Sequence, residues 1–190
     1  MHIDRKTKET SISLSIKQNR SDGISIETPL PFFSHMLESM FFHGDFAAHL
    51  VADGDVDVDP HHLIEDCGIV LGQAINQLAE EKYFHIHRFG YAIIPMDDAL
   101  CEAIIDIGGR SYLSYGINLP QQFAGTFYLP LVREFFLGCT QHAHMNIHLL
   151  SRSGENGHHI VEATYKAFGR ALSQALGEGH ETIPSTKGSV

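Results

Sequence analysis

The sequence is short of basic residues and of long apolar runs. Its 13 lysines and arginines stand against 23 aspartates and glutamates, which gives a formal net charge of −10. Nucleic acid and anionic membranes do not attract such a surface, so neither is an expected partner. No run of about 18 apolar residues is present, and the opening MHIDRKTKETS lacks the apolar segment of a signal peptide. We therefore expect a cytoplasmic protein without a membrane span.

Cysteine is also scarce. Cys67, Cys101 and Cys139 are odd in number and scattered, which excludes an all-thiolate structural zinc site and favours reduced thiols in the core. Histidine, in contrast, is abundant, with 14 copies in 190 residues. A chain of this length suits one domain, or two small halves that share an interface.

One motif occurs in both halves of the chain. Residues 61–78 read HHLIEDCGIVLGQAINQL, and residues 158–175 read HHIVEATYKAFGRALSQA. Two histidines, a glutamate and a glycine recur at a constant separation of 97 residues (158 − 61 = 97). Upstream, His35 corresponds to Glu134 at a separation of 99 residues (134 − 35 = 99). The difference falls in the loop before each histidine pair. Since loops tolerate changes in length, the pattern indicates an internal duplication.

The same order of secondary-structure elements is expected in both halves. Alternating apolar residues predict strands, including two joined by a turn at Ser21–Gly23, and apolar residues at helical spacing predict helices. The first half has strands within residues 9–29, a helix over 31–44, a strand over 46–53 and a long helix over 61–78. The second half has strands within residues 89–109 and 111–119, with 95–99 as an interruption, a helix over 129–143, a strand over 145–154 and a helix over 158–176.

This order gives two ββαβα units. We predict an α+β fold in which each half has a four-stranded, mostly antiparallel sheet with both helices on one face. The two halves are residues 1–84 and 85–178 of a single compact protein. The tail, residues 179–190, lacks periodicity and is expected to become ordered only when something binds it.

The repeated motif is suited to metal binding. On a helix, His61 lies one turn from Glu65, and His158 lies one turn from Glu162, so each pair can converge on one ion. The second histidine of each motif points about 100° around the helix axis and must serve something else. Each motif therefore serves two ions, or one ion in this chain and one on a neighbour.

A further ligand for each site comes from the preceding helix of each half, from His35 or Glu134. The eight candidate metal ligands are His35, His61, His62, Glu65, Glu134, His158, His159 and Glu162. Mixed imidazole and carboxylate ligands suit Mn²⁺, Fe²⁺ or Zn²⁺. A single His-His pair is usually exposed on the surface and binds no metal, but a surface position gives no reason for two histidines and a glutamate to recur together.

Six stretches of sequence occur in combination and span nearly the whole chain. They read FFSHMLESMFFHG, DPHHLIEDCGIVLGQA, RFGYAIIPMDDAL, DIGGRSYL, GENGHHIVEATYKAFGRAL and PSTKG. Together they strongly resemble the imidazoleglycerol-phosphate dehydratase family of histidine biosynthesis. The resemblance implies a duplicated half-domain with a fold like that of ribosomal protein S5 domain 2. It also implies two Mn²⁺ ions per active site, with other divalent metals as alternatives, and self-association into a 24-mer with active sites between subunits.

The resemblance implies a reaction and a distribution of ligands. Family members dehydrate D-erythro-imidazole glycerol phosphate to imidazole acetol phosphate and water, with the substrate ring bound to the two Mn²⁺ ions as an imidazolate. One ion is then held by His61, Glu134, His158 and Glu162, and the other by His35, His62, Glu65 and His159. Many family members carry histidine where this chain has Glu134, and a carboxylate is an acceptable manganese ligand.

The resemblance also assigns substrate contacts outside the motif. These are Glu9, Arg88, Arg110, Ser185 and Lys187, and Lys166, one turn past Glu162, is a further candidate. Arginine suits a phosphate group because its guanidinium donates two parallel hydrogen bonds, although a solvated surface charge is the plain alternative for each residue. The candidate proton carriers are Glu9, Glu65, Asp97 and Glu162, and the sequence does not rank them.

Two other functions remain open at this stage. A di-metal hydrolase would use a bridging hydroxide to attack a phosphate ester, and the paired ligands permit it. A metal-storing or purely structural assembly would need the ligands but not the arginines or the Ser-Thr-Lys tail. In each case, ligands shared between chains would make metal binding and self-association depend on each other.

Overall fold

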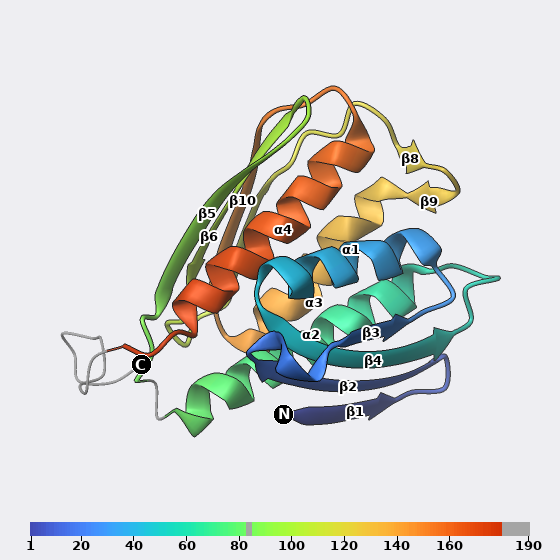
Figure 1. Ribbon diagram of the computed structural model, residues 1–190. Coiled ribbons are helices and arrows are strands. Elements are labelled where there is room, and N and C mark those ends of the chain that lie inside the picture. Colours follow the sequence, from blue (N-terminus) through green and yellow to red (C-terminus); the bar gives the residue numbers. More distant parts are fainter. Residues whose placement is uncertain (83–84, 180–190) are drawn as a thin grey trace.

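The computed structural model describes residues 1–82 and 85–179, so Ser185 and Lys187 lie outside the described residues. In this part of the chain, four α-helices pack between two four-stranded sheets (Figure 1). The first half contains β1 (His2–Lys6), β2 (Thr10–Gln18), β3 (Ile24–Glu27), α1 (Pro31–His43), β4 (Phe46–Gly54) and α2 (His61–Glu81). The second half contains β5 (Phe89–Met96), β6 (Ala99–Asp106), β7 (Tyr112–Gly116), β8 (Phe123–Ala124), β9 (Phe127–Tyr128), α3 (Val132–Ala143), β10 (Asn146–Ser153) and α4 (Gly157–Ala175).

Both large sheets have the same topology. Their strand orders are β1-β2-β4-β3 and β5-β6-β10-β7. Neighbouring strands are antiparallel except that β3 runs parallel to β4 and β7 runs parallel to β10. The predicted α+β duplication, with a mostly antiparallel four-stranded sheet and two helices in each half, is confirmed.

Two elements do not follow from the sequence pattern. The first is β1, an edge strand in which only Ile3 is buried, so its sequence has almost no apolar alternation. Three strands therefore precede α1, where the pattern predicts two. The second is the short β8–β9 hairpin, which is too short to carry a periodic signal. The predicted turn at Ser21–Gly23 is a 3₁₀ helix over Arg20–Asp22, and it leads β3 to the far side of β4 rather than back along β2.

The alternation of apolar and polar residues along β2 shows why only one side of each sheet packs on the helices. Ile12, Leu14 and Ile16 are buried, and the serines between them lie on the other face of the sheet. The helices cover the buried side, and the buried residues of both halves form one hydrophobic cluster. The core therefore lies between the two sheets, among the helices.

Helices from different halves pack closely in pairs, α1 against α4 and α2 against α3. Glycine permits this close approach because it has no Cβ. A Cβ at Gly169 of α4 would collide with the carbonyl oxygen of Met40 on α1, and one at Gly68 of α2 would collide with the carbonyl oxygen of Phe135 on α3. These cross-half contacts determine which candidate ligands can meet. None of the helices in the described ranges is long and apolar enough to cross a membrane.

Tyr165 of α4 provides a test of the core. Its ring lies 5.4 Å from that of Phe135 and 5.1 Å from that of Phe136, between ring centroids. Its buried hydroxyl has no hydrogen-bond partner among the described residues. An unsatisfied buried polar group costs about 1–3 kcal/mol, so Tyr165→Phe should raise the free energy of unfolding by about 1 kcal/mol in urea titrations. The exposed Tyr112→Phe is the control, and a loss of stability in Tyr165→Phe would show that its hydroxyl has a partner.

Candidate metal centre

Three candidate ligands meet where α1 of the first half crosses α4 of the second half. Nε2 of His158 lies 3.1 Å from Oε2 of Glu162, one helical turn along α4. Nε2 of His35, on α1, lies 3.5 Å from the same oxygen. One potential ligand atom from each residue lies within 4.8 Å of the other two. Two imidazoles and a carboxylate at this separation fit Mn²⁺, Fe²⁺ or Zn²⁺.

Glu162 is the buried member of this cluster. Its side chain is 8% exposed, against 50% for His35 and 42% for His158, so the cluster opens to solvent on its histidine side. Burial raises the pKa of Glu162, but Lys166 and the two histidines outweigh burial and hold this pKa below its ordinary value. Nζ of Lys166 lies 2.8 Å from Oε1, the oxygen that faces away from the histidine pair. Glu162 is therefore ionised near neutral pH, in the form that binds a cation.

Both motifs start with the same contact at the beginning of a helix. Oδ1 of Asp59 accepts a hydrogen bond from the backbone N–H of His61 at 2.9 Å, and Oδ1 of Asn156 accepts one from that of His158 at 2.9 Å. The first N–H groups of a helix lack partners within the helix, so such acceptors fix where the helix begins. In both halves the first histidine of the motif is therefore placed on the first turn of a helix.

The packing of the helices brings together side chains that the family-implied distribution assigns to different ions. That distribution assigns His35 to one ion and His158 with Glu162 to the other, and it stays a prediction. Within this chain Nε2 of His35 lies 3.5 Å from Oε2 of Glu162, so these three side chains are also close enough to share one ion. His35 lies beside Glu162 because α1 packs on α4, the helix of the other half. A sequence repeat reveals which positions are equivalent, but it does not reveal which helices pack across the halves.

The first-half motif is less complete. Nε2 of His61 lies 3.7 Å from Oε2 of Glu65. Their helix packs on α3, which carries Glu134, but the Glu134 carboxylate lies 3.1 Å from Nη1 of its neighbour Arg133. Within residues 1–82 and 85–179, the cluster around His35 is the one group of three potential ligands close enough to share an ion. The structure therefore does not bring Glu134 to the first-half pair within that limit.

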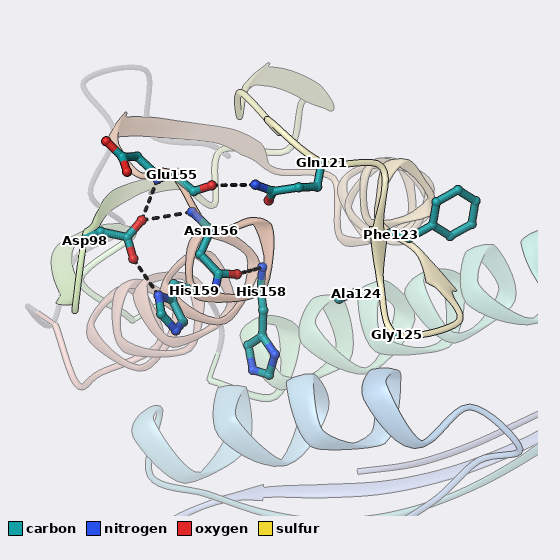
Figure 2. A pocket seen from close by; sticks show the side chains of 9 residues that line it. All are labelled: Asp98, Gln121, Phe123, Ala124, Gly125, Glu155, Asn156, His158 and His159. Carbon is teal, nitrogen blue, oxygen red and sulfur yellow. Dashed lines mark hydrogen bonds and ion pairs between the residues drawn. The ribbon is translucent and has the colours of Figure 1, made fainter.

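The second histidine of each motif contacts a carboxylate from a hairpin turn. Nδ1 of His62 lies 2.8 Å from Oε2 of Glu9, between β1 and β2. Nδ1 of His159 lies 2.5 Å from Oδ1 of Asp98, between β5 and β6 (Figure 2). The hydrogen bond from His159 and two backbone N–H groups hold the pKa of Asp98 well below its usual range. Sequence reasoning missed Asp98, and the signal that finds it is the equivalence of the two hairpins.

A pocket opens beside the two histidines of the second motif. Figure 2 shows it between the start of α4, the turn that carries Asp98, and the segment that runs from Gln121 to Gly125. Gln121 holds the loop before α4 from both sides, because its Oε1 accepts from the N–H of Gly157 and its Nε2 donates to the carbonyl of Glu155, each at 2.6 Å. The pocket therefore leaves His158 and His159 accessible to a small molecule, beside a loop that Gln121 anchors.

The candidate proton carriers differ in exposure. Oδ2 of Asp97 lies 3.5 Å from Nε2 of His159, and the Asp97 side chain is 74% exposed. Glu9, on His62, is 59% exposed. Glu162, in contrast, is enclosed by its cluster. Asp97 and Glu9 are therefore the carboxylates beside motif histidines that are most open to solvent.

The candidate phosphate-binding arginines lie away from the second-motif histidines of the same chain. Arg88 precedes β5, and Asp97 and Asp98 follow it, so a rise of about 3.3 Å per residue separates the two ends by about 25 Å. Nε of Arg88 lies 2.6 Å from Oδ1 of Asp106, and this hydrogen bond raises the pKa of Arg88. Arg110 is exposed and follows β6 at the same end of the sheet. Lys166 alone among the described candidate cations contacts the ligand cluster.

The chain is similar to known proteins over nearly its whole length. A family model described as imidazoleglycerol-phosphate dehydratase matches residues 28–172. The protein of that name from Gluconobacter oxydans is 43% identical over 189 residues, which cover 98% of this chain and 95% of the relative. That from Citrifermentans bemidjiense is 45% identical over 190 residues, which cover 99% and 97%. The crystal structure of the Staphylococcus aureus dehydratase has a TM-score of 0.83 at 37% identity and covers 94% of this chain and 99% of its own. The Pyrococcus furiosus structure has a TM-score of 0.87 at 37% identity and covers 99% and 100%.

Proposed function

Since the chain belongs to the imidazoleglycerol-phosphate dehydratase family of hydro-lyases, we propose that it works with two divalent metal ions, of which Mn²⁺ fits best. The reaction is the dehydration of D-erythro-imidazole glycerol phosphate to imidazole acetol phosphate and water in histidine biosynthesis. One observation supports the metal dependence: potential ligand atoms of His35, His158 and Glu162 lie within 4.8 Å of one another.

The residues of the two halves would hold two divalent ions in sites with different sets of ligands. The first site has His35, His158 and Glu162, two imidazoles and one carboxylate. The equivalent side chains of the duplicate are His61, Glu65 and Glu134, one imidazole and two carboxylates. His62 and His159 point elsewhere on their helices and would complete sites in neighbouring copies of the chain.

The chemistry divides between the ions and the side chains. When bound, such ions supply Lewis acidity that stabilises negative charge developing on the substrate's imidazole ring. Asp97 and Glu9 would carry protons, because each lies beside a motif histidine and is open to solvent. Arg88 and Arg110 would bind the phosphate group, together with Ser185 and Lys187 of the tail. Because these arginines lie far from the second-motif histidines of the same chain, they would serve the active site of a neighbouring copy.

Self-association, which we propose reaches a 24-mer, has independent support from the second sheet. Its outer face exposes aromatic and aliphatic side chains on neighbouring strands, namely Phe89, Tyr91, Ile93, Ile104, Tyr112 and Leu150. The outer face of β2, in contrast, carries serines. An apolar face of this kind on a soluble enzyme is typical of a protein–protein contact. A cytoplasmic location belongs to the same proposal, and the three buried free cysteines suit a reducing compartment.

Metal removal tests the proposal. We expect the purified protein to convert imidazole glycerol phosphate to the ketone, to lose this activity after exhaustive chelation, and to recover it when Mn²⁺ is added. Release of free phosphate instead of the ketone would favour the di-metal hydrolase. Full activity in chelated protein shown to be free of metal would contradict the metal dependence.

A further inference from the structure

Asp98 holds the start of α4 and the His159 side chain at the same time. Its Oδ2 accepts hydrogen bonds from the backbone N–H groups of Glu155 at 2.5 Å and Asn156 at 2.9 Å. Its Oδ1 lies 2.5 Å from Nδ1 of His159. Figure 2 shows the carboxylate between the loop and the imidazole, with one oxygen directed to each. The loop therefore fixes the carboxylate, and the carboxylate fixes the ring.

The contact at Nδ1 decides which nitrogen of His159 can bind a cation. An ionised carboxylate accepts hydrogen bonds but cannot donate them, so Nδ1 carries the proton. In a neutral imidazole the other nitrogen, Nε2, then holds the free lone pair. Nε2 lies on the side of the exposed Asp97, 3.5 Å from Oδ2 of that residue. The ring is thus presented as an Nε2 ligand.

We propose that Asp98 is a positioning residue that fixes the tautomer and direction of His159, so that Nε2 of His159 binds a divalent metal ion. The inference rests on the proposed function, because the ion is one of the two proposed there. Loss of a carboxylate that orients a metal-bound histidine typically lowers metal affinity about 10–100-fold. The contact between Glu9 and His62 is the equivalent in the other half. The Glu9 and His62 side chains are both 59% exposed, so this contact orients its histidine more weakly.

Asp98→Asn separates the role on the ring from the role on the loop. The amide oxygen can still accept from the N–H groups of Glu155 and Asn156, while the amide NH₂ group faces Nδ1 of His159. Nδ1 must then accept, the proton moves to Nε2, and the ring no longer offers Nε2 to a metal. We expect the Mn²⁺ affinity of the full-length protein, measured by equilibrium dialysis, to fall about 10–100-fold. Pulsed EPR of the bound Mn²⁺ should lose the coupling to one imidazole nitrogen.

Two further variants complete the design. Asp98→Ala removes both roles and should also lower the unfolding temperature of the metal-free protein, whereas Asp98→Asn should not. Glu102→Gln on β6 removes a carboxylate of the same hairpin that pairs with Arg152 at 2.6 Å, and it should bind Mn²⁺ like the wild type.

The outcomes distinguish this inference from the proposed function. Wild-type Mn²⁺ affinity and wild-type nitrogen couplings in Asp98→Asn would overturn the inference. So would equal losses of thermal stability in both Asp98 variants with unchanged nitrogen couplings, because Asp98 would then only anchor the loop. A wild-type protein that binds Mn²⁺ but does not dehydrate the substrate would contradict the proposed function alone. A wild-type protein that binds no Mn²⁺, Zn²⁺ or Co²⁺ would contradict both.

Discussion

His158→Ala should reduce the rate of dehydration by about 1000-fold or more. The substitution removes one of the two imidazoles that meet on Oε2 of Glu162, and it leaves two ligands where three converge. Loss of the ion would remove several kcal/mol of charge stabilisation, and each 1.36 kcal/mol corresponds to a factor of ten in rate. The measurement is kcat with imidazole glycerol phosphate at saturating Mn²⁺, together with Mn²⁺ bound per chain.

The same experiment needs a test of folding. His158 is 42% exposed and begins a helix that is otherwise anchored by its apolar face, so the metal-free variant should unfold at nearly the wild-type temperature. His2→Ala is the matched control, because His2 lies on the edge strand β1 and its ring contacts Asp4 and Ser15, neither of which is a candidate ligand. Full turnover in His158→Ala would remove the His35 cluster from the mechanism.

Gly169→Ala should destabilise the protein by about 2 kcal/mol, the usual range for an overpacked core. A Cβ at this position meets the carbonyl oxygen of Met40, which is backbone and cannot rotate away, so α1 must move off α4. His35 lies on the same helix, and its 3.5 Å separation from Glu162 would increase with that movement. A displacement of about 1 Å can cost about 100-fold in rate, so activity should fall beyond the loss of folded protein.

Urea unfolding and initial rates measure the two effects separately. Gly116→Ala on β7 is the control, since the nearest atom to its added Cβ lies 3.4 Å away, an ordinary contact distance. Its stability and activity should match the wild type. A Gly169→Ala protein of wild-type stability would show that α1 and α4 can move apart without a loss of folding free energy. The cross-half helix pair would then not be what positions the ligands.

The sequence predicts which side chains of each motif lie close together because the relevant geometry is local. A histidine and a glutamate four positions apart on a helix share a face whatever the rest of the fold does. His158 and Glu162 meet for this reason, and His61 and Glu65 lie close for the same reason. The alternation in β2 is equally local, since it requires only that one face of the strand be buried.

Contacts between distant segments are what the sequence does not predict. His35 and Glu162 are brought together by the packing of two helices from different halves, and neither helix carries a local signal for its partner. Asp98 and His159 are 61 residues apart, and a single aspartate in a turn resembles any solvated turn residue. The β1 edge strand is missed for a related reason, because one buried side chain gives no period.

The central claim is that each chain holds two divalent ions in ligand sets supplied by its duplicated motif. Elemental analysis of active protein, purified without chelators, tests it most directly. Two transition-metal ions per chain, with Mn²⁺ predominant, is the predicted result. Fully active protein that carries fewer than one such ion per chain would contradict the account.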